Sequence, residues 1–132
     1  MKGGRKVKVR FKSEKHKKTF TEFINRNVKN PYRSRCEYLA AVYLLSSDKF
    51  LWKRAQKALT GYSVNFNSLD LSGISTEGYA LYMAARTIYR GDVDISLSEL
   101  CDADLIDDSI VMTVLGGVLL LRNGIGMLKW RI

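Results

Sequence analysis

The sequence predicts a mainly α-helical protein: a compact bundle of five to six helices in one domain covering residues 1–132. Three observations favour this fold class. Apolar residues recur at spacings of three and four through most of the chain, which is the period of amphipathic helices. Residues that cap helices stand where these segments begin. The 132 residues include one proline and no low-complexity tract, so we expect no long linker.

The segment from Asp107 to Arg122 is the most apolar in the chain, and we expect it to form the central helix of the bundle. Asp107 is suited to cap its start, and Gly124 is suited to end it. The uncharged run 109–121 is shorter than the roughly 20 residues that a membrane span needs. Gly116-Gly117 weakens a helix by about 1 kcal/mol per Gly relative to Ala. This pair therefore predicts the close approach of a neighbouring helix.

The earlier helices follow from local signals. Ser13 is expected to cap a helix over residues 14–28, which ends before Pro31 because the residue before a proline avoids helical backbone angles. Ser34-x-x-Glu37 has the spacing of a capping box and predicts the start of a second helix. The run Ser46-Ser47-Asp48 predicts a break and a third helix that continues to about residue 59.

Two further helices precede the apolar segment. Residues 62–74 show no clear period and fit a loop or a short strand. Ser75 or Thr76 is expected to cap a helix that continues to Arg90, and Gly91 to end it. Ser96-x-x-Glu99 predicts a second capping box, at the start of a short helix over residues 97–103.

Both chain ends alternate apolar and charged residues, the period-two pattern of a half-buried strand. The alternating apolar residues are Val7, Val9 and Phe11 near one end and Leu128, Trp130 and Ile132 at the other. We expect residues 1–12 to form a basic strand or arm that pairs with the C-terminal segment as a small two-stranded ribbon over the helices. The alternative is that both tails are frayed and their lysines only aid solubility.

Charge is distributed unevenly along the chain, which has a formal net charge of +9. Residues 1–35 contain thirteen Lys and Arg, opposed only by Glu14 and Glu22. Residues 91–121 contain seven Asp and Glu and no Lys or Arg. Such asymmetry bears on binding partners and association rates rather than on the fold.

No residue pattern indicates an enzyme or a metal site, so we expect a protein without catalytic activity, metal or cofactor. His16 is the only histidine; it stands among lysines, and we expect it on the surface of its helix. The acidic residues of 91–121 do not match the spacing of a calcium-binding loop. Cys36 and Cys101 match no metal or redox spacing. Two reduced cysteines and the lack of a secretory signal pattern predict a cytoplasmic protein that does not enter a membrane.

The basic N-terminal region gives the main functional hypothesis, a small non-enzymatic protein that contacts nucleic acid or a ribonucleoprotein. Clustered Lys and Arg neutralise phosphates and release counterions, which gives affinity without sequence preference. Aromatic residues such as Phe11 and Tyr32 stand among these cations and are candidates to stack on bases. The proposed phosphate contacts are Lys6, Lys8, Arg10, Lys12, Lys15, Lys17, Lys18, Arg33 and Arg35.

Three segments resemble a family of short uncharacterised proteins from Gram-positive bacteria and their phages and mobile elements. The matching segments are residues 34–54 (SRCEYLAAVYLLSSDKFLWKR), residues 81–91 (LYMAARTIYRG) and the LLLR that closes the apolar helix. The resemblance covers most of the chain after Lys12 and consists mainly of core hydrophobic residues. It implies a compact helical domain and supplies no catalytic residues.

This resemblance motivates an alternative hypothesis, a phage or mobile-element inhibitor of a host defence nuclease, of the anti-CRISPR type. Such an inhibitor would act by protein–protein contact, with carboxylates imitating phosphates. The candidate residues are Asp92, Asp94, Glu99, Asp102 and Asp104. A third interpretation, a homo-oligomer, depends on the wide apolar surfaces, and Gly116-Gly117 or the terminal ribbon would then lie at the interface.

Overall fold

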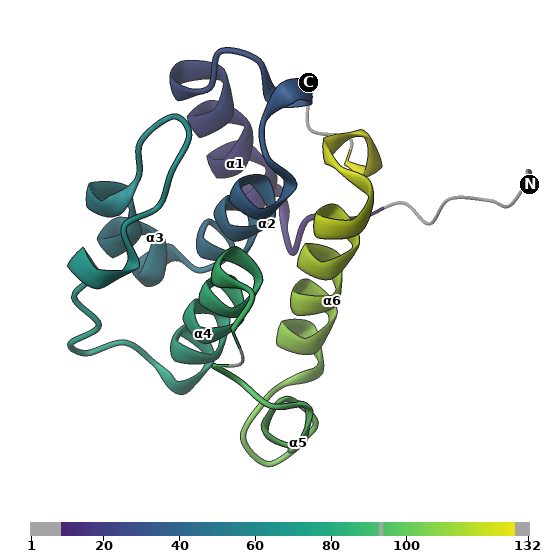
Figure 1. Cartoon of the computed structure of the whole chain (residues 1–132). Helices are drawn as coiled ribbons and strands as arrows, with labels where there is room; N and C mark the ends of the chain where they lie inside the picture. Colours follow the sequence, from purple (N-terminus) through teal and green to yellow (C-terminus); the bar gives the residue numbers. More distant parts are fainter. Residues whose placement is uncertain (1–8, 93, 129–132) are drawn as a thin grey trace, which may run out of the picture.

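The structure is a computed structural model that describes residues 9–92 and 94–128. Over these ranges the protein is mainly α-helical, with six α-helices and no strand, which confirms the expected fold class (Figure 1). The helices are α1 (Glu14–Asn27), α2 (Cys36–Leu45), α3 (Lys49–Ala55), α4 (Thr76–Arg90), α5 (Leu97–Leu100) and α6 (Asp108–Asn123). Short 3-10 turns join them: η1 (Pro31–Arg33), η2 (Gln56–Ala58), η3 (Phe66–Ser68) and η4 (Ile125–Met127).

Helix α2 is the centre of the bundle. Every residue from Tyr38 to Leu45 is buried, and α2 packs against both α4 and α6, which also contact each other (Figure 1). The expectation that the C-terminal helix is central was therefore wrong. Helix α6 buries one side, with Ile110 and Leu120 in the core, and exposes the opposite side. No helix in the part of the chain described is long and apolar enough to cross a membrane.

Gly116 and Gly117 allow α6 to approach α2 closely, as predicted. A Cβ atom added to Gly116 would lie 2.5 Å from the hydroxyl oxygen of Tyr43. One added to Gly117 would lie 2.9 Å from a methyl carbon of Leu44. Both glycines are buried, and the neighbour that they approach within the chain is α2.

Most predicted helix starts are confirmed by hydrogen bonds from backbone N–H groups to capping side chains. The residues that cap in this way are Ser13 for α1, Asp48 for α3, Ser75 for α4 and Asp107 for α6. Ser96 and Glu99 form the complete capping box predicted for α5. Gly91 ends α4 with φ of 79°, in the left-handed region that favours glycine.

The capping box predicted at Ser34 and Glu37 is absent. Helix α2 begins at Cys36 and its N-cap residue is Arg35, which makes no capping hydrogen bond through its side chain. Ser34 instead closes the η1 turn, and its hydroxyl donates to the carbonyl of Asn30. The carboxylate of Glu37 accepts a hydrogen bond from Arg35 at 2.8 Å. The spacing of Ser34 and Glu37 fits a capping box, but the Ser34 hydroxyl is bonded within the turn that begins at Pro31.

The two ends of the described chain meet. Val9 and Leu128 form an isolated parallel bridge, and the Val9 N–H donates to the Met127 carbonyl at 2.9 Å. The terminal segments therefore lie side by side at this point, as the ribbon prediction requires. The remainder of the predicted ribbon, residues 1–8 and 129–132, lies outside the residues described.

Candidate nucleic-acid interface

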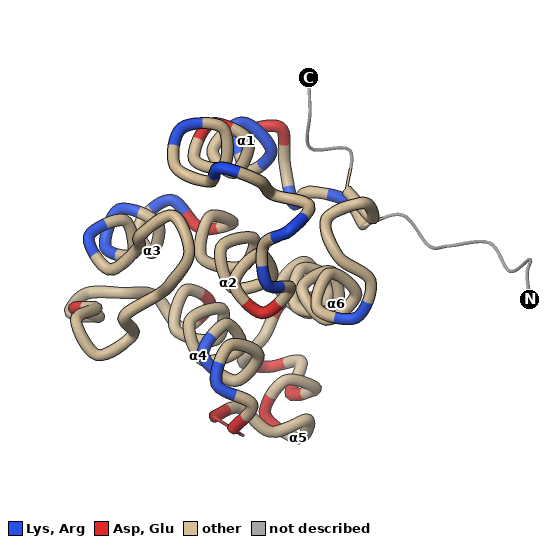
Figure 2. The backbone as a smooth tube through the Cα atoms, turned by 45° about the horizontal axis from the view of Figure 1, so that its top comes forward, with Lys and Arg blue, Asp and Glu red and all other residues tan. Residues whose placement is uncertain are grey.

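The predicted phosphate contacts that the structure describes are mostly exposed but do not form one cluster. Lys6 and Lys8 lie outside the residues described. Of the other seven, Lys17 is half-buried, and the exposed ones are Arg10, Lys12, Lys15, Lys18, Arg33 and Arg35. Figure 2 shows basic residues on α1, on the segment that follows it and on α3, whereas acidic residues gather near α5. The predicted phosphate contacts therefore lie on several separate parts of the surface.

One basic feature is a groove between α1 and α3. Phe23 of α1 and Trp52 of α3 meet edge to face between the two helices, with ring centroids 5.3 Å apart. Two adjoining hollows of about 200 and 190 Å³ lie along this contact and share Thr19 and Trp52 in their lining. We call them together the α1/α3 groove.

Three cations line the α1/α3 groove. Lys15 and Lys49 line the hollow nearer the start of α1, and Arg26 lines the other. None of the three forms an ion pair with any residue that the structure describes. Glu22 is the one carboxylate in the lining of the two hollows. Positive charge here is therefore available to an external ligand.

The hypothesis from sequence missed the cations of α3 and of the turn after it. Lys49, Lys53 and Lys57 are exposed, whereas Arg54 donates to the Asp70 carbonyl at 2.8 Å. The sequence pattern had already placed these residues on the polar side of their helix. What it could not show is that α3 lies beside α1, where Phe23 contacts Trp52.

A second basic hollow, of about 550 Å³, lies beyond the end of α1, and we call it the η1 hollow. Its lining includes Lys29, Arg33, Arg35 and Tyr62. A Cβ atom on Gly61 would overlap the backbone at the end of α1, so only glycine lets the chain pass this close and set Tyr62 at the rim. Tyr62 is 78% exposed, and its ring could stack on a base.

Arg35 is partly neutralised within the η1 hollow. Its guanidinium contacts the carboxylate of Glu37 at 2.8 Å. Hydrogen bonding to Glu37 raises the pKa of Arg35, and the same bond lowers the pKa of the Glu37 carboxyl. Lys29 and Arg33 have no carboxylate partner among the residues described. These two are therefore the stronger candidates for phosphate contact here.

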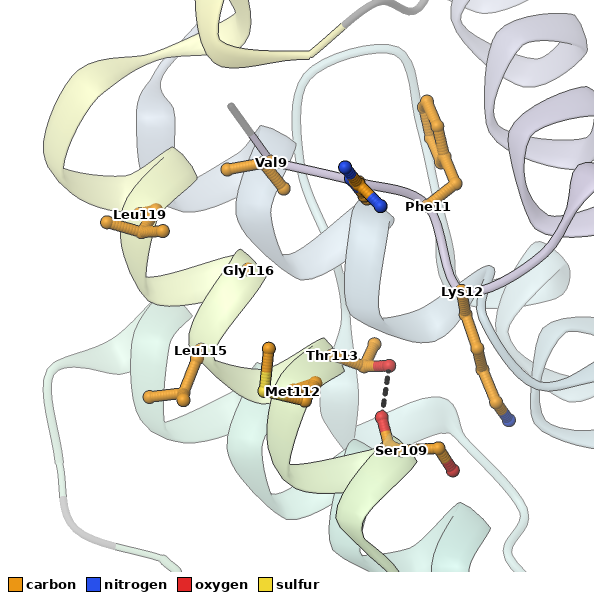
Figure 3. Close-up of a pocket in the computed structure, with 10 residues that line it drawn as sticks. Val9, Phe11, Lys12, Ser109, Met112, Thr113, Leu115, Gly116 and Leu119 are labelled. Atoms are coloured by element: carbon orange, nitrogen blue, oxygen red, sulfur yellow. Dashed lines mark hydrogen bonds between the residues drawn. The ribbon is translucent and has the colours of Figure 1, made fainter. Parts of the chain in front are cut away.

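Arg10 and Lys12 lie in another part of the molecule. They line a hollow of about 430 Å³ between residues 9–12 and α6 (Figure 3). Hydrogen bonds from Ser109, and more weakly the charge of Lys12, lower the pKa of Asp107 at the start of α6. The structure therefore separates Arg10 and Lys12 from the α1/α3 groove. Lys17 and Lys18 are on α1 and line none of the hollows described above.

His16 is buried, which corrects the expectation that it lies on the surface. Its Nδ1 accepts the Lys12 N–H at 2.9 Å, so Nε2 carries the proton and donates to the Tyr43 carbonyl at 2.8 Å. Burial lowers the pKa of His16 to about 4. The hydrogen bond to Tyr43 acts in the opposite direction, and the charge of Lys12 lowers the pKa slightly further. His16 is a neutral residue that anchors the start of α1. Phe20 and Ile24 continue its buried stripe at four-residue spacing, a signal that the sequence contained.

The acidic candidates are used largely within the protein. Asp94 pairs with Arg86 at 3.5 Å, and both side chains are half-buried. Hydrogen bonds from Ser96 lower the pKa of Glu99 in the α5 capping box. Asp102 accepts the Asp104 N–H at 3.0 Å. Asp92 and Asp104 are exposed.

The described residues offer no ready metal site. Among them, no group of three or more His, Cys, Asp and Glu is arranged to hold a metal ion. Cys36 and Cys101 are both free; Cys36 is half-buried, whereas Cys101 is exposed at the end of α5.

Comparisons with known proteins add nothing to this geometry. No family model matches the chain, and neither a curated protein nor a solved structure is significantly similar to it. The family resemblance inferred from sequence stays a prediction. Any functional assignment therefore depends on the α1/α3 groove, the η1 hollow and the residues that surround them.

Proposed function

We propose that this protein is a non-enzymatic nucleic-acid-binding protein whose contact surface is formed by α1, α3 and the η1 hollow. The observation that carries the proposal is the set of three groove cations, Lys15, Arg26 and Lys49, which have no acidic partner among the residues described. Residues 12–57 contain twelve Lys and Arg against four Asp and Glu, so the surrounding surface has the same sign. Such a surface attracts phosphates and gains affinity by releasing counterions.

The shape of the surface favours a single strand. The α1/α3 groove would follow a phosphate backbone, and the η1 hollow would receive an unpaired base against Tyr62. Stacking of a base on an aromatic ring contributes about 1–3 kcal/mol and tolerates any base. A duplex hides its bases and would use only the cations. The proposal therefore predicts tighter binding of single-stranded than of double-stranded oligonucleotides.

Charge reversal in the α1/α3 groove tests the proposal. The double variant Lys15→Glu/Lys49→Glu should weaken binding of a fluorescent single-stranded oligonucleotide by about 100-fold or more at low salt. Its matched control, Arg10→Glu/Arg90→Glu, changes net charge equally and should retain most of the affinity. Circular dichroism would check that both variants fold. Equal losses in the two variants would show that net charge acts without this groove.

Glu22 permits the opposite experiment. Because it is the one carboxylate lining the α1/α3 groove, Glu22→Lys should strengthen binding several-fold. Its control is Glu77→Lys on α4, an equal change of charge outside the groove. A gain limited to Glu22→Lys supports the groove. Unchanged or weaker binding by this variant contradicts it.

A further inference from the structure

Helix α6 exposes an apolar stripe from Val111 to Leu119. Met112 is 66% exposed, Leu115 is 46% exposed and Val118 is 43% exposed, with Val111 and Leu119 half-buried beside them. Figure 3 shows Met112, Leu115 and Leu119 on successive turns of the helix. No charged residue interrupts α6 between Ser109 and Leu121. The solvent-facing side of a helix is ordinarily polar, so this face lacks the character of a surface that stays in water.

The stripe is symmetric about Leu115. Met112 and Val118 each stand three residues from it, and Val111 and Leu119 each stand four residues from it. Asp108 and Arg122, both exposed, each stand seven residues from it, with opposite charges. At 3.6 residues per turn, positions 108, 115 and 122 follow one line along the helix. The stripe therefore has apolar residues at its centre and one charge of each sign at its ends.

We propose that this face binds the same face of a second copy of the chain, with the two α6 helices antiparallel. A two-fold axis would pass beside Leu115, as an isologous interface requires. Met112 of one copy would then lie across from Val118 of the other, and Asp108 across from Arg122. Parallel helices would instead bring Asp108 next to Asp108 and Arg122 next to Arg122. Charge complementarity thus favours a second copy of the chain as the partner, and an antiparallel direction for its α6 helix.

The surroundings of the stripe agree with this arrangement. The 430 Å³ hollow beside Met112, Leu115 and Leu119 has residues 9–12 on its other side, where Val9 and Phe11 alternate with Arg10 and Lys12. Its apolar part offers space for a side chain of the second copy. In Figure 1, α3 lies across α2 and α4 from α6, which leaves the α1/α3 groove open in the dimer. A 16-residue helix is about 24 Å long, so the interface is small and the dimer should be of micromolar affinity.

Sedimentation velocity of the intact protein from about 1 to about 200 µM tests the proposal, because small interfaces associate in this range. Wild type should shift from monomer to dimer, and Leu115→Lys should stay monomeric. The control Leu97→Lys removes a leucine that is 79% exposed on α5 and should dimerise like wild type. Circular dichroism would check the fold of both variants. Wild-type protein that stays monomeric, or Leu115→Lys protein that still dimerises, would overturn the proposal.

A charge exchange tests the direction of the helices. Asp108→Lys and Arg122→Glu should each weaken the homodimer by about tenfold or more, because each places like charges together at both ends. Mixed in equal amounts, the two variants should form a heterodimer of near wild-type affinity, since both charge pairs are then restored. Failure of the mixture to recover association would rule out the antiparallel pairing.

Discussion

The basic and acidic regions of this protein differ in what their charged side chains do. Around α5 and the start of α6, carboxylates take part in the fold: Glu99 completes a capping box, Asp107 caps α6 and Asp94 pairs with Arg86. Around the α1/α3 groove, Lys15 and Lys49 have no such role. Both regions are rich in charge of one sign. Several carboxylates of the acidic region thus have partners within the fold, whereas the groove cations have no ion pair among the residues described.

His16 is the exception in the basic region, and it gives the largest expected effect on stability. Its pKa of about 4 in the folded protein lies below the ordinary value of 6.5, so the unfolded chain takes up a proton first. The associated stability is complete above pH 6.5 and is lost as the pH falls towards 4. This loss should reach about 3 kcal/mol in the free energy of unfolding.

Urea denaturation at several pH values measures the effect of His16. Its control is His16→Gln, whose amide could make both hydrogen bonds of the imidazole without titrating. That variant should lose most of the pH dependence between pH 7 and 5, above the range in which carboxylates titrate. An unchanged pH dependence in His16→Gln would contradict the role given to this histidine.

The acidic region should show the next largest effect. Asp107→Ala removes the side chain that accepts the Ser109 N–H at the start of α6. Loss of such a cap should lower the midpoint of thermal unfolding by about 3 to 5 °C. Asp92→Ala is the matched control, since Asp92 is exposed and caps no helix. Equal midpoints for the two variants would show that the carboxylates of this region are not structural.

The groove cations should show the smallest effect on stability. Lys15→Ala and Lys49→Ala each remove an exposed side chain without an ion pair among the residues described. Each should change the free energy of unfolding by less than about 0.5 kcal/mol, while weakening oligonucleotide binding. Urea denaturation beside a binding titration compares the two properties. A large loss of stability would mean that these lysines serve the fold, as the carboxylates do.

The same comparison bears on the alternative, an inhibitor that imitates phosphates. Two of the five carboxylates it would need are used within the fold, Glu99 in the α5 capping box and Asp94 in the pair with Arg86. The exposed Asp92 and Asp104 remain for such a partner. Purification from host lysate before and after nuclease treatment separates the two functions. A protein retained after nuclease treatment would favour the inhibitor.

Local features of the fold could be predicted from the sequence, and relations between helices could not. The caps at Ser13 and Asp107 depend on a few adjacent residues, so their pattern sufficed. The pattern at Ser34 failed because the turn begun by Pro31 competes for the same serine. The central position of α2 rather than α6 depends on three-dimensional packing, since both helices are apolar on most sides.

The candidate site shows the same division. The basic character of residues 1–35 was evident, and Arg33 does line a basic hollow. Lys49 lies beside Lys15 because the packing of the helices places α3 next to α1, where Phe23 contacts Trp52. The burial of His16 could have been predicted by extending the stripe of Phe20 back by one turn. Contacts between distant segments leave no such trace in a single sequence.

The most direct test of the central claim is the salt dependence of oligonucleotide binding by the wild-type protein. Five cations line the α1/α3 groove and the η1 hollow and form no ion pair with a described residue: Lys15, Arg26, Lys29, Arg33 and Lys49. If they contact phosphates of a single strand, a plot of log affinity against log salt should have a slope of about −3 to −4. No binding at low salt, or a slope near zero, would contradict the proposed function.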